Sequence, residues 1–182
     1  MSERMVGAIV LAAGESRRMG THKMLLPFAG RTVIEHVVAG IVEGGITETI
    51  VVVGHGAEGI ADALCGQQVG LIHNPRYAEG MLSSVRAGLS AAPDTWSGAM
   101  ICLGDQPLLS PAVVDALRVA FEGGRGTILV PVHQGRRGHP LVISMAYRAD
   151  VLTRYDGVGL RGLLISRADN VHEIEVDAAS VL

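Results

Sequence analysis

Short apolar runs alternate along the chain with segments in which apolar residues recur at helical spacing. Several of the apolar runs are nearly continuous in Val, Ile and Leu, a pattern typical of parallel strands that are covered on both faces. The runs that predict strands are residues 6–12, 49–53, 69–72, 99–103, 127–132 and 141–144.

Helix signals lie between these runs. Thr32 and Glu35 have the spacing of a capping box, and the amphipathic segment behind them runs to Gly44. Ser110 followed by Pro111 predicts another helix start, with the serine as N-cap. Repeated strand–helix–strand units predict an α/β fold, a three-layer α/β/α sandwich around a mostly parallel sheet. No linker divides the chain, so residues 1–182 are predicted to form a single domain.

Composition narrows the class of protein. Hydrophobic residues make up 48% of the chain and charged residues 18%, which is typical of a folded domain. The net charge of −3 argues against a nucleic-acid-binding surface, and no apolar stretch reaches the roughly 18 residues of a membrane span. Cys65 and Cys102 lie far apart, and the histidines lack the spacing of a zinc site. We therefore expect a reduced, cytoplasmic protein that binds neither nucleic acid nor membrane.

Two residue counts point to one loop. Glycine accounts for 24 of 182 residues, and Lys23 is the only lysine among 15 basic residues. Lys23 ends a loop that begins at Gly14, directly behind the first predicted strand, and that also carries Arg17 and Arg18. The loop matches neither the GxGxxG fingerprint of dinucleotide-binding proteins nor the P-loop. Its small residues and positive charges suit a triphosphate, although a solvated turn has the same composition.

The spacing Leu-Ala-Ala-Gly-x-Ser-x-Arg-Met-Gly-x-x-Lys-x-Leu, which starts at residue 11, resembles the signature loop of the MobA-like nucleotidyltransferases. Within that family it looks most like the molybdenum cofactor cytidylyltransferases. The resemblance implies a Rossmann-like nucleotidyltransferase fold whose loop holds a nucleoside triphosphate, with Arg18 and Lys23 as catalytic groups on the phosphates. The other nucleotide-binding residues that it implies in this loop are Leu11, Ala12, Ala13 and Gly14.

A second motif, Gly104-Asp105-Gln106-Pro107, ends the fourth predicted strand. An aspartate that bonds the neighbouring backbone explains such a turn by itself. The motif also matches the metal-binding turn of the family, which makes Asp105 a catalytic residue and the Mg²⁺ ligand, with Gly104 beside the nucleotide. One aspartate can suffice, because Mg²⁺ takes one or two carboxylates together with substrate phosphates. The glutamine resembles the branch of the family that uses CTP.

The third predicted strand leads into a segment that begins at Asn74. Ser83 and Ser84 lie near an expected helix start at Gly80, where capping is their ordinary role. The segment is also similar to the Asn-Pro-x-Tyr-x-x-Gly-Met-x-x-Ser motif of the family. That resemblance implies that Asn74, Gly80 and Ser84 line the nucleotide pocket.

The connection between the last two predicted strands contains Arg137, Gly138 and His139. A solvated, charged loop explains it equally well, but the family has a matching segment near its pterin substrate. The resemblance therefore makes these three residues substrate-binding. His139 would bind or orient the acceptor and would not act as a general base, because an acceptor phosphate is already ionised near neutral pH. Residues 156–161 resemble a Gly-Ala-Arg element of the family, with Val-Gly in place of Gly-Ala.

The resemblance extends from about residue 5 to near the end of the chain, with one motif missing. Family members usually continue into an Asp-x-Asp-Thr-Pro-Glu-Asp segment whose aspartate can also serve the metal, and this sequence ends without it. The resemblance thus identifies one carboxylate ligand here. Either this is a truncated or divergent member of the family, or another carboxylate takes the second place.

These observations favour a Mg²⁺-dependent enzyme that transfers a nucleotidyl group from CTP, or another nucleoside triphosphate, to an anionic pterin cofactor of the molybdopterin type. The implied protein partner is a molybdoenzyme or its chaperone. Two alternatives stay open. One is an NAD(P)H-dependent oxidoreductase, because some relatives of the family carry that activity. The other is a nucleotide-binding module that has lost catalysis.

Overall fold

The computed structural model describes residues 4–14, 22–177 and 181. In this part of the chain an eight-stranded sheet has the order β10-β7-β9-β6-β1-β4-β5, with β8 paired to β7. All neighbours on this path are parallel except β9, which is antiparallel to β6 and β7. The strands are β1 (Met5–Ala12), β4 (Thr49–Val53), β5 (Gly70–His73), β6 (Trp96–Leu103), β7 (Ile128–His133), β8 (Arg136–Arg137), β9 (Leu141–Ser144) and β10 (Val171–Glu175).

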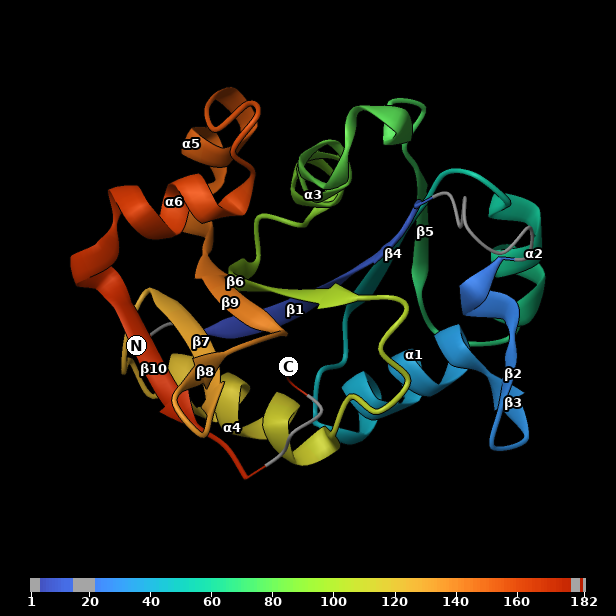
Figure 1. The fold of residues 1–182 in the computed structure, drawn as a ribbon, viewed down its shortest axis with the longest axis horizontal. Coiled ribbons are helices and arrows are strands. Elements are labelled where there is room, and N and C mark those ends of the chain that lie inside the picture. The colour runs from blue at the N-terminus through green and yellow to red at the C-terminus, as the bar shows by residue number, and fades with distance from the viewer. Residues whose placement is uncertain (1–3, 15–21, 178–180, 182) are drawn as a thin grey trace.

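Helices cover both faces of this sheet (Figure 1). One layer contains α1 (Val33–Glu43), α2 (Ala57–Ala63) and α4 (Pro111–Glu122), and the other contains α3 (Met81–Ala91), α5 (Arg148–Thr153) and α6 (Leu160–Ser166). A two-stranded hairpin, β2 (Pro27–Phe28) and β3 (Arg31–Thr32), precedes α1. Short 3₁₀ turns span Lys23–Leu25, Tyr77–Glu79, Met145–Tyr147 and Ala168–Asn170. The predicted three-layer sandwich with a mostly parallel sheet is confirmed.

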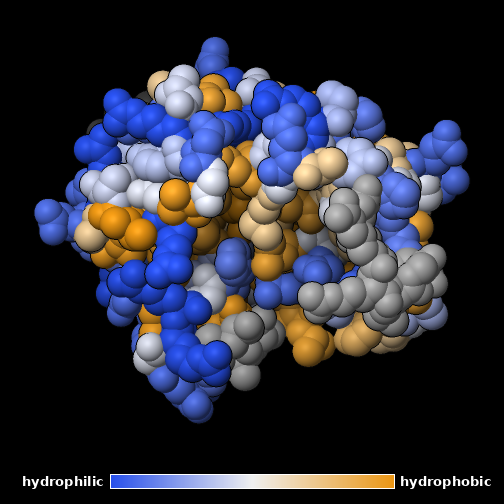
Figure 2. Space-filling model, turned by 45° about the horizontal axis from the view of Figure 1, so that its top comes forward, coloured by the Kyte–Doolittle hydropathy of each residue, from blue (hydrophilic) through white to orange (hydrophobic). Residues whose placement is uncertain are grey.

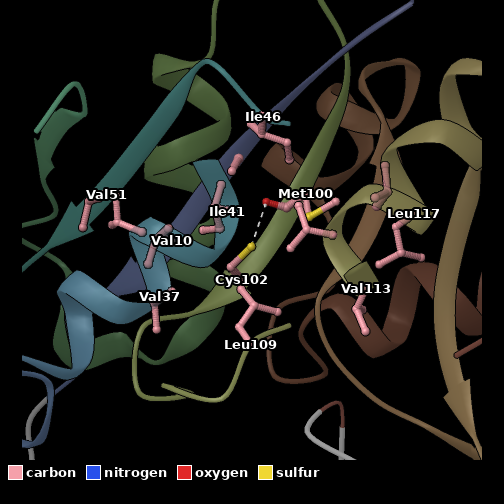
Figure 3. Close-up of a cluster of buried hydrophobic side chains, with 14 of the residues drawn as sticks. Val10, Val37, Ile41, Ile46, Val51, Met100, Cys102, Leu109, Val113 and Leu117 are labelled. Atoms are coloured by element: carbon pink, nitrogen blue, oxygen red, sulfur yellow. Dashed lines mark hydrogen bonds between the residues drawn. The ribbon is translucent and has the colours of Figure 1, made fainter. Parts of the chain in front are cut away.

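Strand β1 shows why the apolar runs are continuous. Side chains alternate along a strand, so a strand between two helical layers must be apolar on both faces. Its two faces contribute to two separate buried clusters, which explains an apolar run without polar interruptions. Val6, Ala8, Val10 and Ala12 belong to the cluster under α1 and α4, part of which is drawn in Figure 3, whereas Ile9 packs beneath α3.

The start of α1 follows the sequence signal closely. The Thr32 side chain accepts a hydrogen bond from the Glu35 backbone N–H, and the Glu35 carboxylate accepts one from the Thr32 backbone N–H at 2.7 Å. These bonds satisfy N–H groups that lack partners in the first turn. They also lower the pKa of Glu35, with the side-chain bond to Thr32 as the largest cause.

The helix start at Ser110 is confirmed, and two details of the strands differ from the prediction. Ser110 is the N-cap residue of α4, but among the described residues its hydroxyl makes no capping hydrogen bond. The fourth strand begins at Trp96 rather than at residue 99, because its pairing with β1 continues to Met5. Strand β10 was not predicted, since Ile174 is its only buried residue and one apolar position does not reveal a strand.

Among the described residues, no helix has both the length and the apolar character needed to cross a bilayer.

Candidate functional site

The carboxyl ends of four parallel strands meet at one edge of the sheet. Strand β1 lies between β4 and β6, and β5 lies beyond β4. The segments that leave these ends begin at Ala13, Gly54, Asn74 and Gly104. In open parallel sheets this edge is where ligands bind. The predicted nucleotide and metal residues that the structure describes, from the ends of β1, β5 and β6, therefore lie at or beside one edge.

Gly104 fastens the turn after β6 to the end of β1. Its backbone N–H donates to the Leu11 carbonyl at 3.0 Å. A Cβ at this position would lie 2.8 Å from that oxygen and 2.8 Å from the Met24 sulfur, so the contact requires glycine. The next residue, Asp105, is exposed. Asp105 is thus held beside the β1 end with its carboxylate open to solvent.

The loop after β1 is described at both of its ends. Ala12 and Ala13 are buried, whereas Gly14 is exposed, and no described atom lies within 4 Å of a Cβ built there. Lys23 is exposed and begins the 3₁₀ turn that also contains Met24, which is buried. Arg18 lies outside the described residues, so its predicted place on the phosphates stays a prediction.

Asn74 is held by a network inside the protein. Its backbone N–H donates to the Val53 carbonyl at 2.8 Å, and its side-chain amide donates to the hydroxyls of Ser83 and Ser84 at 2.9 and 3.0 Å. Its carbonyl oxygen accepts the Arg76 backbone N–H. Asn74 is buried, and its amide therefore fixes the first turn of α3 to the end of β5.

The capping role expected for the two serines is wrong. Gly80 is the N-cap residue of α3, with a φ of 105° that favours glycine. Ser83 and Ser84 lie inside the first turn, and their hydroxyls accept from Asn74. Gly80 is exposed, whereas Ser84 is buried. Contact of Asn74, Gly80 and Ser84 with a nucleotide stays a prediction.

A row of aromatic rings at the β4 end was missed by sequence reasoning. His22 Nε2 lies 2.7 Å from the His55 carbonyl oxygen, and the two imidazole rings stack with centroids 6.2 Å apart. The His55 ring is also 6.3 Å from the Tyr77 ring. Gly56 leaves room for His22, and Gly54 leaves room for Tyr77. The available signal was the Gly-His-Gly sequence directly behind a buried strand.

Of the predicted acceptor residues, His139 lies near the end of β6, whereas Arg137 lies on β8 beside β7. Strand β9 is antiparallel to β6, with Leu141 opposite Ile101, so the residues just before β9 are close to the carboxyl end of β6. The His139 N–H donates to the Val181 carbonyl, and burial of the imidazole lowers its pKa. A lower pKa favours the neutral ring at physiological pH.

Arg137 already has a partner in the structure. Its Nε donates to Glu173 on β10 at 2.7 Å, and both side chains are about half exposed. Gly138 donates its N–H to the Pro131 carbonyl and has no room for a Cβ next to Val181. An exposed ion pair of this kind contributes at most about 1 kcal/mol, so a phosphate dianion can compete for Arg137.

Metal-ligating side chains are sparse. Among the described residues, no group of three or more His, Cys, Asp or Glu side chains could hold a metal ion. Such a cluster would suit a resident transition metal, whereas Mg²⁺ keeps water and substrate phosphates as most of its ligands. One exposed carboxylate, Asp105, fits that donor set.

Figure 2 turns the layer of α3, α5 and α6 toward the viewer. The face is hollowed near its middle, where hydrophobic side chains show between hydrophilic borders. A concave surface with apolar walls and a few polar groups is typical of sites for small molecules.

Comparison with known proteins decides the family. Residues 8–171 match the MobA-like NTP transferase domain. The chain belongs to this family. It is a nucleotidyltransferase by family, which confirms the resemblance of its motifs.

Proteins similar to this chain carry names of different activities. The molybdenum cofactor cytidylyltransferase of Escherichia coli (strain K12) is 26% identical over 97% of this chain and 88% of its own length. The nicotine blue oxidoreductase of Paenarthrobacter nicotinovorans is 34% identical over 84% of this chain and 77% of its own length.

The fold is shared with a solved mycobacterial protein. Rv0371c from Mycobacterium tuberculosis H37Rv superposes with a TM-score of 0.85, with 27% identity over 97% of this chain and 90% of that one. Its complex with manganese superposes with a TM-score of 0.77, with 26% identity over the same shares. The α/β sandwich described above is therefore the fold of this relative too.

Proposed function

We propose that this protein transfers a cytidylyl group from CTP to the phosphate of a molybdopterin-type cofactor and releases pyrophosphate. The observation that carries the proposal is the fastening of the Asp105 turn to the end of β1, where the nucleotide loop begins. Family membership supports nucleotidyl transfer, and the Escherichia coli relative supports this pair of substrates.

The reaction requires positioning and charge neutralisation more than covalent chemistry. An oxygen of the acceptor phosphate attacks the α-phosphorus of CTP in line, and the bond from that phosphorus to the bridging oxygen of pyrophosphate breaks. Lys23 and Arg18 neutralise the triphosphate and the leaving pyrophosphate. The backbone at Ala12, Ala13 and Gly14 binds the nucleotide at the carboxyl edge of the sheet.

Asp105 is the residue that would hold Mg²⁺. The ion, when bound, supplies positive charge to the phosphate oxygens. The manganese complex of the mycobacterial relative supports a divalent cation in a protein of this fold.

The acceptor would lie against Arg137, Gly138 and His139. Arg137 can exchange its exposed ion pair with Glu173 for a phosphate, since a guanidinium binds phosphate through two parallel hydrogen bonds. His139 in its neutral form can orient the acceptor by hydrogen bonding. The implied protein partner for the product is a molybdoenzyme or its chaperone, and the two free cysteines support a reduced, cytoplasmic location.

A second candidate is an NAD(P)H-dependent oxidoreductase, and the oxidoreductase of Paenarthrobacter supports a redox activity. A nucleotide-binding module without catalysis is a third. Calorimetric titration with CTP, GTP, ATP and NADPH, each with and without Mg²⁺, separates the candidates. Mg²⁺-dependent preference for CTP is the expected result. Mg²⁺-indifferent binding of NADPH would contradict the transferase proposal, and CTP binding without pyrophosphate release to a competent acceptor would indicate the binding module.

A further inference from the structure

Arg86 joins α3 to the loop between α5 and α6. Its guanidinium donates to the Val151 carbonyl at 2.9 Å, to the Arg154 carbonyl at 2.7 Å and to the Asp156 carboxylate at 2.7 Å. The Arg86 side chain is only 20% exposed. Its planar fork of donors reaches all three acceptors at once, which a lysine cannot do.

The loop that Arg86 holds has an unfavourable backbone. Tyr155, Gly157 and Gly159 have positive φ angles of 74°, 73° and 70°. A left-handed tyrosine is strained, and such a conformation persists only where the surroundings fix it. Arg86 bonds the residues on both sides of Tyr155, so it provides that restraint.

Arg86 also lines a pocket beside the segment that leads into α3. Arg76 and Glu79 form a two-bond ion pair there, and the Arg76 N–H is bonded to Asn74. The bond from Arg86 lowers the pKa of Asp156, and the charge of Arg76 acts in the same direction. Arg76 and Arg86 line the same pocket, so the ion pair of the segment lies near the ion pair of the loop.

Tyr77 and Tyr155 each pack against the buried cluster beneath α3, but an open space also lies beside Arg86. A pocket of about 200 Å³ lies between Asn74 and Arg76 on one side and the α3 face on the other. Its α3 residues are Ser83, Arg86, Ala87 and Ser90. Beside this space, the hydrogen bonds of Asn74 and Ser83 fix segment 74–80 to the first turn of α3.

We propose that Arg86 is a positioning residue of the nucleotide site. It fixes loop 154–159 against α3, and the first turn of α3 holds Asn74 through Ser83 and Ser84. Asn74 and Gly80 of segment 74–80 would meet the nucleotide. The inference rests on the proposed function in one respect, namely that this segment borders the nucleotide.

The chain offers a matched control. Arg148 on α5 also reaches α3, donating to the Ser90 carbonyl at 3.0 Å and to Asp94 at 3.1 Å. It joins the same two helices at the other end of α3, away from segment 74–80. Arg86→Met and Arg148→Met each remove one such link and keep most of the side-chain volume.

The experiment compares these two variants with the wild-type protein by thermal unfolding, by hydrogen exchange and by calorimetric titration with CTP and Mg²⁺. Both variants are expected to lower Tm. Only Arg86→Met is expected to speed exchange in segments 74–80 and 154–159, and to weaken CTP binding about tenfold. Arg86→Lys keeps the charge without the fork, so it should weaken CTP binding by less than Arg86→Met does.

Equal effects of the two methionine variants on CTP binding would overturn the proposal, as would unchanged exchange in loop 154–159 of Arg86→Met. Pyrophosphate release decides the transfer reaction separately. If the wild-type protein binds CTP but transfers nothing, the proposed function fails and the comparison at Arg86 still gives its answer. If the wild-type protein binds no nucleoside triphosphate, both proposals are wrong.

Discussion

The two ends of the β1–β6 strand pair use glycine for opposite purposes. At the amino end, Gly7 lies against the indole of Trp96 and Gly98 lies against the ring of Phe121, with no room for a Cβ at either position. Beyond the carboxyl ends of β1 and β5, Gly14 and Gly80 have no described atom within 4 Å of such a Cβ. The first pair serves packing, whereas the second leaves backbone open to a ligand.

The two pairs of glycines therefore have different expected roles, one in stability and the other in ligand binding. Trp96 is buried, and its indole N–H donates to Glu48 at 2.6 Å, so the ring cannot move aside cheaply. The carboxyl edge has exposed glycines and exposed charges, including Lys23 and Asp105. Changes at the amino end should therefore alter unfolding, and changes at the carboxyl edge should alter ligand binding and turnover.

The largest expected effect concerns Lys23. Lys23→Ala should lower the rate of pyrophosphate release from CTP at least about a hundredfold, because it removes a positive charge from the developing leaving group. Arg125→Ala is the matched control, since Arg125 is an exposed cation near the amino end of β7. Equal rates in the two variants would contradict the role of Lys23.

The next effect is on stability. Gly7→Ala should lower the free energy of unfolding by about 1 to 3 kcal/mol, because its methyl group overlaps the Trp96 indole. Each kcal/mol corresponds to about 2 to 4 °C in Tm for a chain of this size. Turnover measured well below Tm should stay at the wild-type value. A loss of turnover without a loss of Tm would contradict the view that Gly7 serves packing alone.

Gly14→Ala tests the other side of the comparison. Tm should stay unchanged, since no described atom meets the added methyl group. The affinity for CTP should fall about tenfold, or about 1.4 kcal/mol, because the methyl group occupies space at the ligand backbone contact. Thermal unfolding measures Tm and calorimetric titration measures the affinity for CTP. A lower Tm with unchanged affinity would indicate that Gly14 serves packing and not ligand binding.

The smallest effect is expected at His139. Replacement of a general base costs about a hundredfold or more, so His139→Gln should lower turnover by less than about tenfold if the ring only orients the acceptor. A hundredfold loss would contradict this view.

His139 also predicts a pH dependence of stability. Burial lowers its pKa below the ordinary 6.5, so the wild-type protein has the full contribution of the neutral ring above that pH. The contribution is lost as the pH falls through the lowered pKa. The difference in unfolding free energy between wild type and His139→Gln should shrink over that range, with His172→Gln on exposed β10 as the control.

Local patterns predicted the parts of the fold that depend on local physics. Continuous apolar runs identified the central strands because both faces of the sheet are covered, and the Thr32–Glu35 spacing identified a helix start because the capping bonds are short-range. Strand β10 lacked such a signal, since Ile174 is its only buried residue.

The contacts of the site depend on residues far apart in the sequence. Ser83 and Ser84 lie next to a helix start, yet their hydroxyls accept hydrogen bonds from Asn74, nine and ten positions earlier. Arg86 bonds a loop some 70 positions later. Neither spacing follows from periodicity, so the sequence shows the motifs but not the hydrogen bonds that hold them.

Asp105 gives the most direct test of the account. Pyrophosphate release from CTP, with Mg²⁺ and a molybdopterin-type acceptor, should be compared between Asp105→Asn and Asp169→Asn. Asp169 is also exposed, but it lies just before β10 at the opposite edge of the sheet. The account predicts a loss of at least about a hundredfold for Asp105→Asn and a rate within about twofold of wild type for Asp169→Asn. A near wild-type rate for Asp105→Asn would contradict the placement of the reaction at the β1–β6 edge.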